Sequence, residues 1–319
     1  MTQERDILFA MPDNPVPPAS HAGYLETTDG YRLRYATFKA TGRPLRGTVI
    51  ILHGRNECIE KYFETINELS EAGFGAATFD WRGQGGSDRL LKDRARGYVD
   101  DFATYVADLE QFMTDVVLPD CRGPYYILGH STGSLIALLA SPNMTNRIRR
   151  MVLGSPLLAI RQKMMSARSV ALIARMLDLV GLGRIYMAGG PRPREIAPFA
   201  TNKLTTDHRR YMRNARLYEE HPELALGGPT VAWVNAACMA MEEVTDPEFI
   251  AGIRVPALMI SAGNDSIVSN EAIEHYARAM RSGALLTIDG ARHELLQEAD
   301  GYRSPFMAAA LAYFSGEQG

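Results

Sequence analysis

Short apolar runs rich in Val, Ile and Leu alternate with helix-like stretches along most of the chain. The strand-like runs lie in TVIILHG (48–54), GAATFDWRG (75–83), YYILGHSTG (125–133), IRRMVLGSP (148–156), VPALMISAG (255–263) and ALLTIDG (284–290). Helical patterns lie between or after them, at 60–72, 99–118, 270–280 and 305–314. We expect the first helix to end at Gly73 and the second to stop before Pro119. This order predicts βαβ units, and therefore an α/β fold with a mainly parallel central sheet flanked by helices.

The amino-terminal part of the pattern differs, because two strand-like segments within residues 23–38 follow each other directly. They are separated by Asp29-Gly30, a pair that favours a hairpin turn since glycine tolerates a positive φ. We therefore expect an antiparallel pair of strands ahead of the parallel ones.

The alternation breaks between residues 158 and 237. This stretch is helical, basic and rich in Met, with Gly and Pro interruptions and no strand-like run. We therefore predict two parts of the chain: an α/β core of residues 1–157 and 238–319, and an inserted helical segment of residues 158–237.

Composition limits the class of protein. The 319 residues are 46% hydrophobic and 22% charged, which indicates a sizeable core and excludes intrinsic disorder. The longest apolar stretches fall far short of the roughly 20 residues that span a bilayer, so we predict no transmembrane helix. The first residues, MTQERDILFAMPDNPVPP, lack the basic start and apolar run of a signal peptide, so we expect a cytoplasmic protein.

The cysteine pattern indicates neither a metal nor a redox site. Cys58, Cys121 and Cys238 are widely spaced and form no CxxC pair, so we expect reduced, partly buried thiols. The glycine-rich stretches at 83–86 and 181–183 lack the strand, GxGxxG and helix of a nucleotide site, and no Walker lysine follows them. We therefore predict neither a cofactor nor a metal.

Positive charge is concentrated in the inserted segment. Residues 157–218 contain twelve Lys or Arg and three acids, a local charge of +9. Because the net charge of the whole chain is −3, the rest of the chain carries −12. Such a block favours anionic partners, either lipid head groups or nucleic acid. No nucleic-acid-binding module accompanies it, so we predict no nucleic-acid partner. A solvated helical surface explains the block equally well.

The segment GHSTG at 129–133 carries the strongest catalytic signal. It fits GxSxG, with a strand-like run before it and a helical one after it, which is the context of a nucleophile elbow. The glycines permit the strained turn that exposes the serine. Ser131 is therefore the candidate nucleophile.

A serine hydroxyl needs a histidine base and a carboxylate that orients it. Around such an elbow these partners follow in the order Ser, acid, His, each after a later strand. Asp265 follows the run at 255–263 and His293 follows the run at 284–290, so we predict Asp265 as the acid and His293 as the base.

Other candidates fit less well. His53 and His130 come before or beside Ser131, so chain order argues against either as the base, and we expect them to form hydrogen bonds. Asp80 follows an earlier strand and is expected to organise its loop, and Asp289 is too close in sequence to His293. Asp265 could also serve only as a turn or helix cap.

Acyl transfer further requires donors for an oxyanion, and two backbone amides can supply them. One belongs to the residue after the nucleophile, Thr132, and the other to the loop after an earlier strand, here Arg55 in HGR.

In chain order, HGRNE, FDWRGQGGSD, GHSTG, SAGND and GARHE resemble the α/β-hydrolase fold over nearly the whole chain. Two longer segments, TNKLTTDHRRYMRNARLYEEHPELALGGPTVAWV and GARHELLQEADGYRS, are similar to bacterial lysophospholipases of the L2 group, in the branch that contains monoacylglycerol lipases. The resemblance implies a triad of Ser131, Asp265 and His293, with Arg55 and Thr132 at the oxyanion positions. Arg55 departs from the small or apolar residue that such lipases often carry there, and this makes the entrance more polar.

The resemblance also implies that residues 158–237 form a cap over the active site. In MMSARSVALIARMLDLV, one helical face carries Met165, Leu172, Ile173, Met176, Leu177 and Val180. Arg161, Arg168 and Arg175 repeat every seven residues along another stripe, and Arg209, Arg213 and Arg216 repeat on a later helix. This pattern fits peripheral contact with an anionic membrane, such as the inner face of the cell membrane. It fits equally well a cap packed on the core with arginines in solvent.

The function expected from these features is a serine esterase that cleaves the acyl ester of a lysophospholipid or related monoacyl lipid through an acyl-enzyme. A monoacylglycerol lipase, a small-ester carboxylesterase or an aminopeptidase of the same fold are alternatives, with Glu219, Glu220, Glu242 and Glu243 as candidates for binding an amine. A non-catalytic binding protein is a further alternative, against which the intact triad argues.

Overall fold

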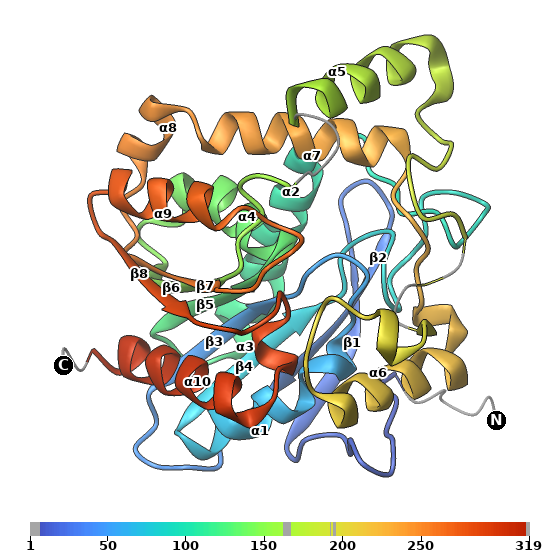
Figure 1. Cartoon of the computed structure of the whole chain (residues 1–319). Helices are drawn as coiled ribbons and strands as arrows, with labels where there is room; N and C mark the ends of the chain where they lie inside the picture. Colours follow the sequence, from blue (N-terminus) through green and yellow to red (C-terminus); the bar gives the residue numbers. More distant parts are fainter. Residues whose placement is uncertain (1–6, 162–166, 192, 194–195, 317–319) are drawn as a thin grey trace.

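The chain folds around one eight-stranded sheet, seen in a computed structural model that describes residues 7–316 except 162–166, 192 and 194–195 (Figure 1). The strands are β1 (Ser20–Glu26), β2 (Arg32–Phe38), β3 (Gly47–Leu52), β4 (Phe74–Phe79), β5 (Tyr125–His130), β6 (Ile148–Gly154), β7 (Ala257–Ala262) and β8 (Gly283–Ile288). Their order is β1-β2-β4-β3-β5-β6-β7-β8. The β1–β2 and β2–β4 pairs are antiparallel and the others are parallel, so the predicted α/β fold and the hairpin around Asp29-Gly30 are confirmed.

Helices cover both faces of the sheet. They are α1 (Phe63–Glu71), α2 (Phe102–Phe112), α3 (Leu118–Asp120), α4 (Thr132–Ala140), α5 (Ala167–Leu177), α6 (His208–Glu220), α7 (Val231–Val244), α8 (Pro247–Gly252), α9 (Asn270–Ala279) and α10 (Asp300–Ser315). Successive side chains of a strand point to opposite faces of the sheet, so neighbouring residues of one strand pack against different layers of helices. On β3, Ile50 packs in the layer of α2, α4, α7 and α9, whereas its neighbour Ile51 packs in the layer of α1 and α10.

Two helix boundaries differ from those expected. A π-helical turn, η2 (Met113–Val117), follows α2, and helical structure continues through Pro119 to Asp120. The prediction of a stop before Pro119 was therefore wrong, because the proline lies in the first turn of a new short helix, where its missing N–H is tolerated. Helix α10 starts at Asp300 rather than near 305, because Arg303 anchors its first turn through a hydrogen bond to the Leu296 carbonyl (2.9 Å).

The parallel strands place several loops at one edge of the sheet. The loops after β3, β5, β7 and β8 all leave from the carboxyl ends of their strands, which is where α/β folds build their sites. The segment between β6 and β7 contains α5 to α8 and extends this edge. The predicted domain boundary at residue 237 falls inside α7, which continues to Val244.

The inserted segment lies in two places. Helix α7 runs across α2 and α4 and α5 packs on α7, while α6 lies on the other side of the molecule and is joined by ion pairs to Glu64 on α1 and Asp300 on α10 (Figure 1). Among the described residues, no helix is long and apolar enough to cross a membrane.

Candidate active site

Ser131 lies on a sharp turn between β5 and α4. Its backbone has φ 50° and ψ −112°, a conformation that is strained for any residue other than glycine. The turn is possible because the residues on either side of it are glycines without a Cβ. A Cβ at Gly133 would overlap the Leu52 carbonyl, and a Cβ at Gly129 would lie 2.9 Å from Ser134 Cα. A hydrogen bond from the Ser131 amide to the Gly154 carbonyl (3.0 Å) fixes the turn to β6.

The three residues predicted as the triad lie in one hydrogen-bonded chain. The Ser131 Oγ is 3.0 Å from His293 Nε2, and His293 Nδ1 is 2.7 Å from Asp265 Oδ2. Because the carboxylate only accepts, Nδ1 carries a proton, and Nε2 is left as the nitrogen that can accept the serine proton. All three side chains are buried, which protects this arrangement from competing water.

Asp265 is held as an anion by several donors. Its Oδ1 accepts hydrogen bonds from the amides of Ile267 (2.7 Å) and Val268 (3.1 Å). Burial alone would raise the pKa of Asp265, but the hydrogen bond and charge of His293, together with these amides, lower it below its usual range. Arg161 donates to the Asp265 carbonyl, so this arginine, expected on the outer stripe of a cap helix, contacts the acid loop instead.

The loop after β3 is fixed on both sides of Arg55. The Gly54 amide donates to Glu57 Oε2 (2.5 Å), and the Asn56 amide donates to Gln84 Oε1 (2.7 Å). Asn56 has a φ of +62°, which completes the tight turn. These contacts hold the peptide that carries the Arg55 N–H.

Thr132 is the first residue of α4. Its amide therefore belongs to the first turn of the helix, where the backbone N–H groups have no acceptor within the helix. The positive end of the helix therefore lies beside the nucleophile, where it favours a developing negative charge. Arg55 and Thr132 remain our candidates for the oxyanion donors.

The Arg55 side chain links this loop to the inserted segment. Its Nη2 donates to the Gly227 carbonyl (2.5 Å), and its guanidinium carbon lies 5.3 Å from the centre of the Trp233 ring on α7. We expected the Arg55 side chain to make the entrance more polar. In the structure, its guanidinium connects the oxyanion loop to Gly227 and to Trp233 on α7.

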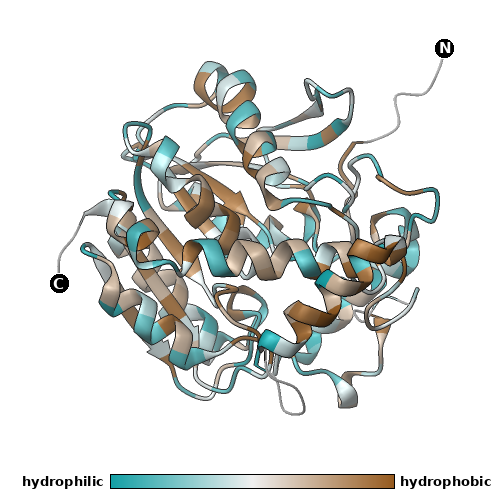
Figure 2. Ribbon diagram, turned by 90° about the horizontal axis from the view of Figure 1, so that it is seen from above, coloured by the Kyte–Doolittle hydropathy of each residue, from teal (hydrophilic) through white to brown (hydrophobic). Residues whose placement is uncertain are grey.

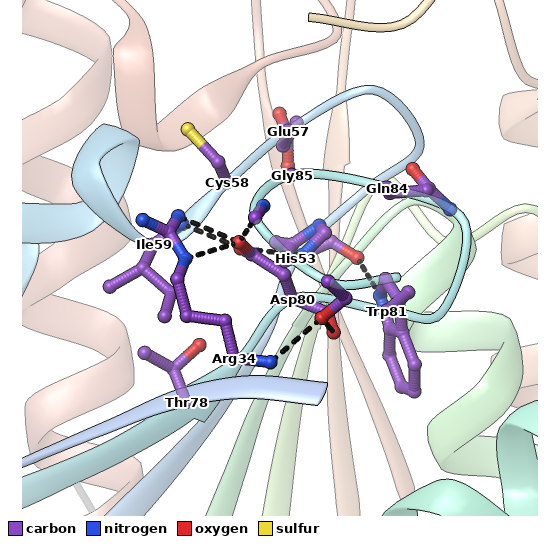
Figure 3. Close-up of polar contacts among 12 residues, drawn as sticks. Arg34, His53, Glu57, Cys58, Ile59, Thr78, Asp80, Trp81, Gln84 and Gly85 are labelled. Atoms are coloured by element: carbon purple, nitrogen blue, oxygen red, sulfur yellow. Dashed lines mark hydrogen bonds and ion pairs between the residues drawn. The ribbon is translucent and has the colours of Figure 1, made fainter. Parts of the chain in front are cut away.

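Asp80 organises a buried polar cluster beneath the same loop (Figure 3). Its carboxylate accepts hydrogen bonds from Arg34 Nε (2.8 Å), the Ile59 amide (3.0 Å) and the Gly86 amide (2.6 Å). Burial opposes ionisation, but Arg34 and His53 outweigh it and lower the pKa of Asp80 to about 2. Asp80 thus binds three neighbouring segments together and takes no part in the Ser131 chain of hydrogen bonds.

Sequence reasoning missed a second buried cluster next to the triad. Glu57, Lys61 and Glu294 are buried charged side chains, and His130 lies against them. Glu57 and Glu294 stand in the HGRNE and GARHE motifs, so acidic residues beside two catalytic loops were the available signal. Lys61 carried no signal, because its contact with Glu294 joins residues 233 positions apart.

The basic block of the inserted segment is divided. On α6, Arg210 and Arg213 are buried and form ion pairs with Glu64 on α1 (2.6 and 2.9 Å), and Arg210 also contacts Asp300 on α10 (2.7 Å). Arg213 therefore contacts the core instead of forming a surface stripe. Arg168 and Arg175 on α5 are exposed. Four residues named in the sequence pattern lie outside the described residues: Lys163, Met165, Arg192 and Arg194.

A cavity of about 200 Å³ lies between α5, α7 and the segment after β6. Its lining is mainly apolar and includes Leu158, Val170, Cys238 and Met241, and it also includes Glu242. The other acids considered for binding an amine, Glu219, Glu220 and Glu243, occupy exposed helix positions. Across the described part of the chain, no three His, Cys, Asp or Glu side chains cluster in a way that could hold a metal ion.

Comparison with known proteins places the chain among hydrolases. The family model of the serine aminopeptidases, S33, matches residues 43–300. Lysophospholipase L2 of Escherichia coli (strain K12) is 33% identical over 299 residues, covering 90% of this chain and 85% of that protein. A probable lysophospholipase L2 of Haemophilus influenzae is 29% identical, covering 88% and 87%.

Solved structures agree on the fold. A soluble variant of monoglyceride lipase from Saccharomyces cerevisiae, in complex with a substrate analog, superposes with a TM-score of 0.74 at 19% identity and covers 95% of this chain and 96% of that one. At this level of identity the likeness concerns the fold. Together with the match to the family model, it shows that the chain belongs to the serine aminopeptidase S33 family of α/β-hydrolases.

Proposed function

We propose that the protein is a serine ester hydrolase that cleaves the acyl ester of a lysophospholipid or related monoacyl lipid. The hydrogen-bonded chain from Ser131 through His293 to Asp265 supports the chemistry most directly. The substrate class rests on the similarity to lysophospholipase L2, which extends over 90% of this chain.

The geometry suggests the following course. His293 Nε2 takes the proton of Ser131 as Oγ attacks the ester carbonyl, and the Arg55 and Thr132 amides stabilise the oxyanion of the tetrahedral intermediate. His293 then gives this proton to the leaving alcohol, and the acyl group stays on Ser131. In the second half, His293 takes a proton from water, the hydroxide attacks the acyl-enzyme, and the fatty acid leaves as Ser131 regains its proton.

The inserted segment acts in this proposal as a cap that receives the lipid. The cavity between α5 and α7 begins at Leu158, one residue after Leu157, whose amide donates to the Ser131 carbonyl (3.2 Å). A mainly apolar space lined by the segment that follows Leu157 suits an acyl chain, because burying each methylene contributes about 0.8 kcal/mol.

Helix α5 is our candidate for contact with an anionic membrane. Leu172, Met176, Leu179 and Val180 expose 61%, 56%, 75% and 67% of their surface on α5 and the following turn η4 (Asp178–Leu182). Seen from above, hydrophobic residues colour this outer helix beside α7 (Figure 2). A cap that merely packs on the core would bury these side chains, and the nearby exposed arginines favour anionic head groups.

Fatty-acid release tests the proposed reaction. The purified protein is offered lysophosphatidylcholine, lysophosphatidylethanolamine and monoacylglycerol in parallel, with Ser131→Ala as the control. We expect release from the lysophospholipids that falls by a factor on the order of 10⁶ in Ser131→Ala, the loss typical of a triad nucleophile.

The outcomes separate the alternatives. Equal release by Ser131→Ala would refute the nucleophile. A preference for monoacylglycerol would keep the mechanism and remove the phospholipid as the preferred substrate. Turnover of aminoacyl amides or short esters alone would refute the lipid substrate and favour the peptidase or small-ester alternative.

A further inference from the structure

Four charged or ionisable side chains form a buried cluster beside the triad, and they come from three separate segments of the chain. Glu57, Lys61, His130 and Glu294 expose 3%, 2%, 4% and 7% of their surface. Glu57 and Lys61 follow the oxyanion loop, His130 precedes Ser131, and Glu294 follows His293. Burial of so many charges is unfavourable unless they balance and pair.

Glu57 is the centre of the cluster. Its Oε1 accepts from Lys61 Nζ (2.9 Å), and its Oε2 accepts from the Gly54 amide (2.5 Å) and the Tyr62 hydroxyl (2.7 Å). His130 Nδ1 lies 3.3 Å from the same Oε2. Lys61 also donates to Glu294 Oε1 (2.7 Å). One carboxylate thus contacts the oxyanion loop and the residue before the nucleophile.

The second ring nitrogen of His130 reaches the base loop. His130 Nε2 lies 3.3 Å from the carbonyl oxygen of His293. A carboxylate and a carbonyl only accept hydrogen bonds, so both ring nitrogens of His130 must donate. A ring that donates from both nitrogens is an imidazolium. Charge balance agrees, because two carboxylates and Lys61 leave one negative charge that a cationic His130 neutralises.

We propose that His130, held as an imidazolium by Glu57, is a positioning residue that fixes the His293 loop relative to Ser131 and the oxyanion loop. It acts through the His293 carbonyl and not on the substrate. This proposal deepens the proposed hydrolase function and rests on it, since it assigns the positioning of the same three loops.

The electrostatics of the surrounding groups are consistent with this state. Burial alone would raise the pKa of Glu57, but Lys61 and His130 outweigh it and hold the pKa well below its usual range. Burial alone would lower the pKa of His130, but the Glu57 carboxylate outweighs it and raises the pKa. Glu294 adds to this effect, Lys61 opposes it, and His53 is the further ionisable ring that acts on Glu57.

The protonation state can be measured without any substrate. In protein labelled with ¹⁵N-histidine, long-range ¹H–¹⁵N correlation spectra distinguish an imidazolium from either neutral tautomer, and the signal missing in His130→Asn assigns the ring. We expect two protonated nitrogens at pH 7 and deprotonation only well above the ordinary histidine value of about 6.5. A neutral ring at pH 7 would overturn the proposal, whether or not the protein cleaves lipids.

Kinetics with a soluble short-chain ester test the positioning role. Glu57→Gln keeps the shape of the side chain and removes its charge, so His130 loses its proton and the His293 loop loses its restraint. We expect kcat to fall by up to about 100-fold with little change in KM, because small misplacements of reacting groups have effects of this size. We also expect the alkaline decline of kcat to begin at lower pH than in the wild type.

A matched control removes the carboxylate charge of another, partly buried ion pair. Arg303 on α10 contacts Glu68 on α1 (2.5 Å), on the face of the sheet away from the cap helices α5 and α7. Glu68→Gln, which makes the same change from carboxylate to amide and leaves the hydrogen bond from Arg303 to the Leu296 carbonyl in place, should keep the wild-type kcat and pH profile. If Glu57→Gln behaves like this control, or lowers kcat without moving the alkaline decline, the positioning role is refuted.

Discussion

Helices α5 and α6 of the inserted segment both carry arginines at three-, four- or seven-residue spacing, yet the fold uses them in opposite ways. On α6, Arg210 and Arg213 expose 2% and 4% of their surface and pair with acids of the core. On α5, Arg168 and Arg175 are exposed beside exposed apolar residues. One helix fastens the inserted segment to the core, and the other leaves its arginines and apolar side chains exposed.

The difference shows that a basic pattern does not by itself identify a partner. Glu64 on α1 and Asp300 on α10 lie where α6 packs, so the positive charge of α6 is neutralised within the molecule. Among the described residues, Arg168 and Arg175 form no ion pair with an acid, so their charges remain available to anions outside the molecule.

The largest effect that tests this comparison is on stability. Arg210→Met removes a buried cation and leaves the half-buried carboxylate of Glu64 with fewer partners, so we expect the free energy of unfolding to fall by about 3 kcal/mol, the lower end for a buried pair. Arg175→Met on α5 should change it by less than about 0.5 kcal/mol. Urea denaturation of both variants gives the two values. Similar losses in both would show that the helices do not differ.

Acid unfolding sharpens the role of α6. Burial opposes ionisation of Glu64, but Arg210, Arg303 and Arg213 outweigh it and lower its pKa to about 2. A depressed carboxyl pKa contributes stability that is fully present above the unfolded value of about 4.3 and is lost as the pH falls toward 2. Arg210→Met/Arg213→Met should therefore show a shallower loss of stability between pH 4.5 and 2 than the wild type.

The control for this experiment carries the same charge loss on α5. Arg168→Gln/Arg175→Gln should retain the wild-type slope of unfolding free energy against pH, because neither arginine faces Glu64. A shallower slope in this variant as well would assign the effect to net charge and not to the α6 ion pairs.

The smallest effect concerns membrane contact and leaves the fold intact. Each basic residue near an anionic bilayer contributes about 1 kcal/mol, so Arg168→Glu/Arg175→Glu should weaken binding to phosphatidylglycerol-containing vesicles by at least about 30-fold. Hydrolysis of a soluble ester should stay unchanged. Arg149→Glu/Arg281→Glu, two exposed arginines near the amino ends of β6 and β8, is the matched control and should bind as the wild type does. Equal binding by all three proteins would leave α5 without a role at the membrane.

Much of the core could be predicted because its signals are local. Alternation of apolar runs gave the strands, since side chains of a buried parallel strand are apolar on both faces. GxSxG identified the turn at Ser131, and the order of strands placed Asp265 and His293 at the same edge, where they lie within 3.0 Å of their hydrogen-bonding partners. Helix α10 was predicted too short, because a tertiary contact of Arg303 determines its first turn.

The sequence by itself therefore determined the α/β fold, the strained turn of the nucleophile and the three residues that meet there. Only the tertiary structure decided which charges are internal. It placed Lys61 between Glu57 and Glu294, turned Arg210 and Arg213 toward Glu64, and left the apolar residues of α5 exposed. The physical reason is that the sequence shows only the neighbours of a side chain along the chain. The free energy of a charged or apolar side chain depends on the partners around it in space, and only folding brings these partners within reach.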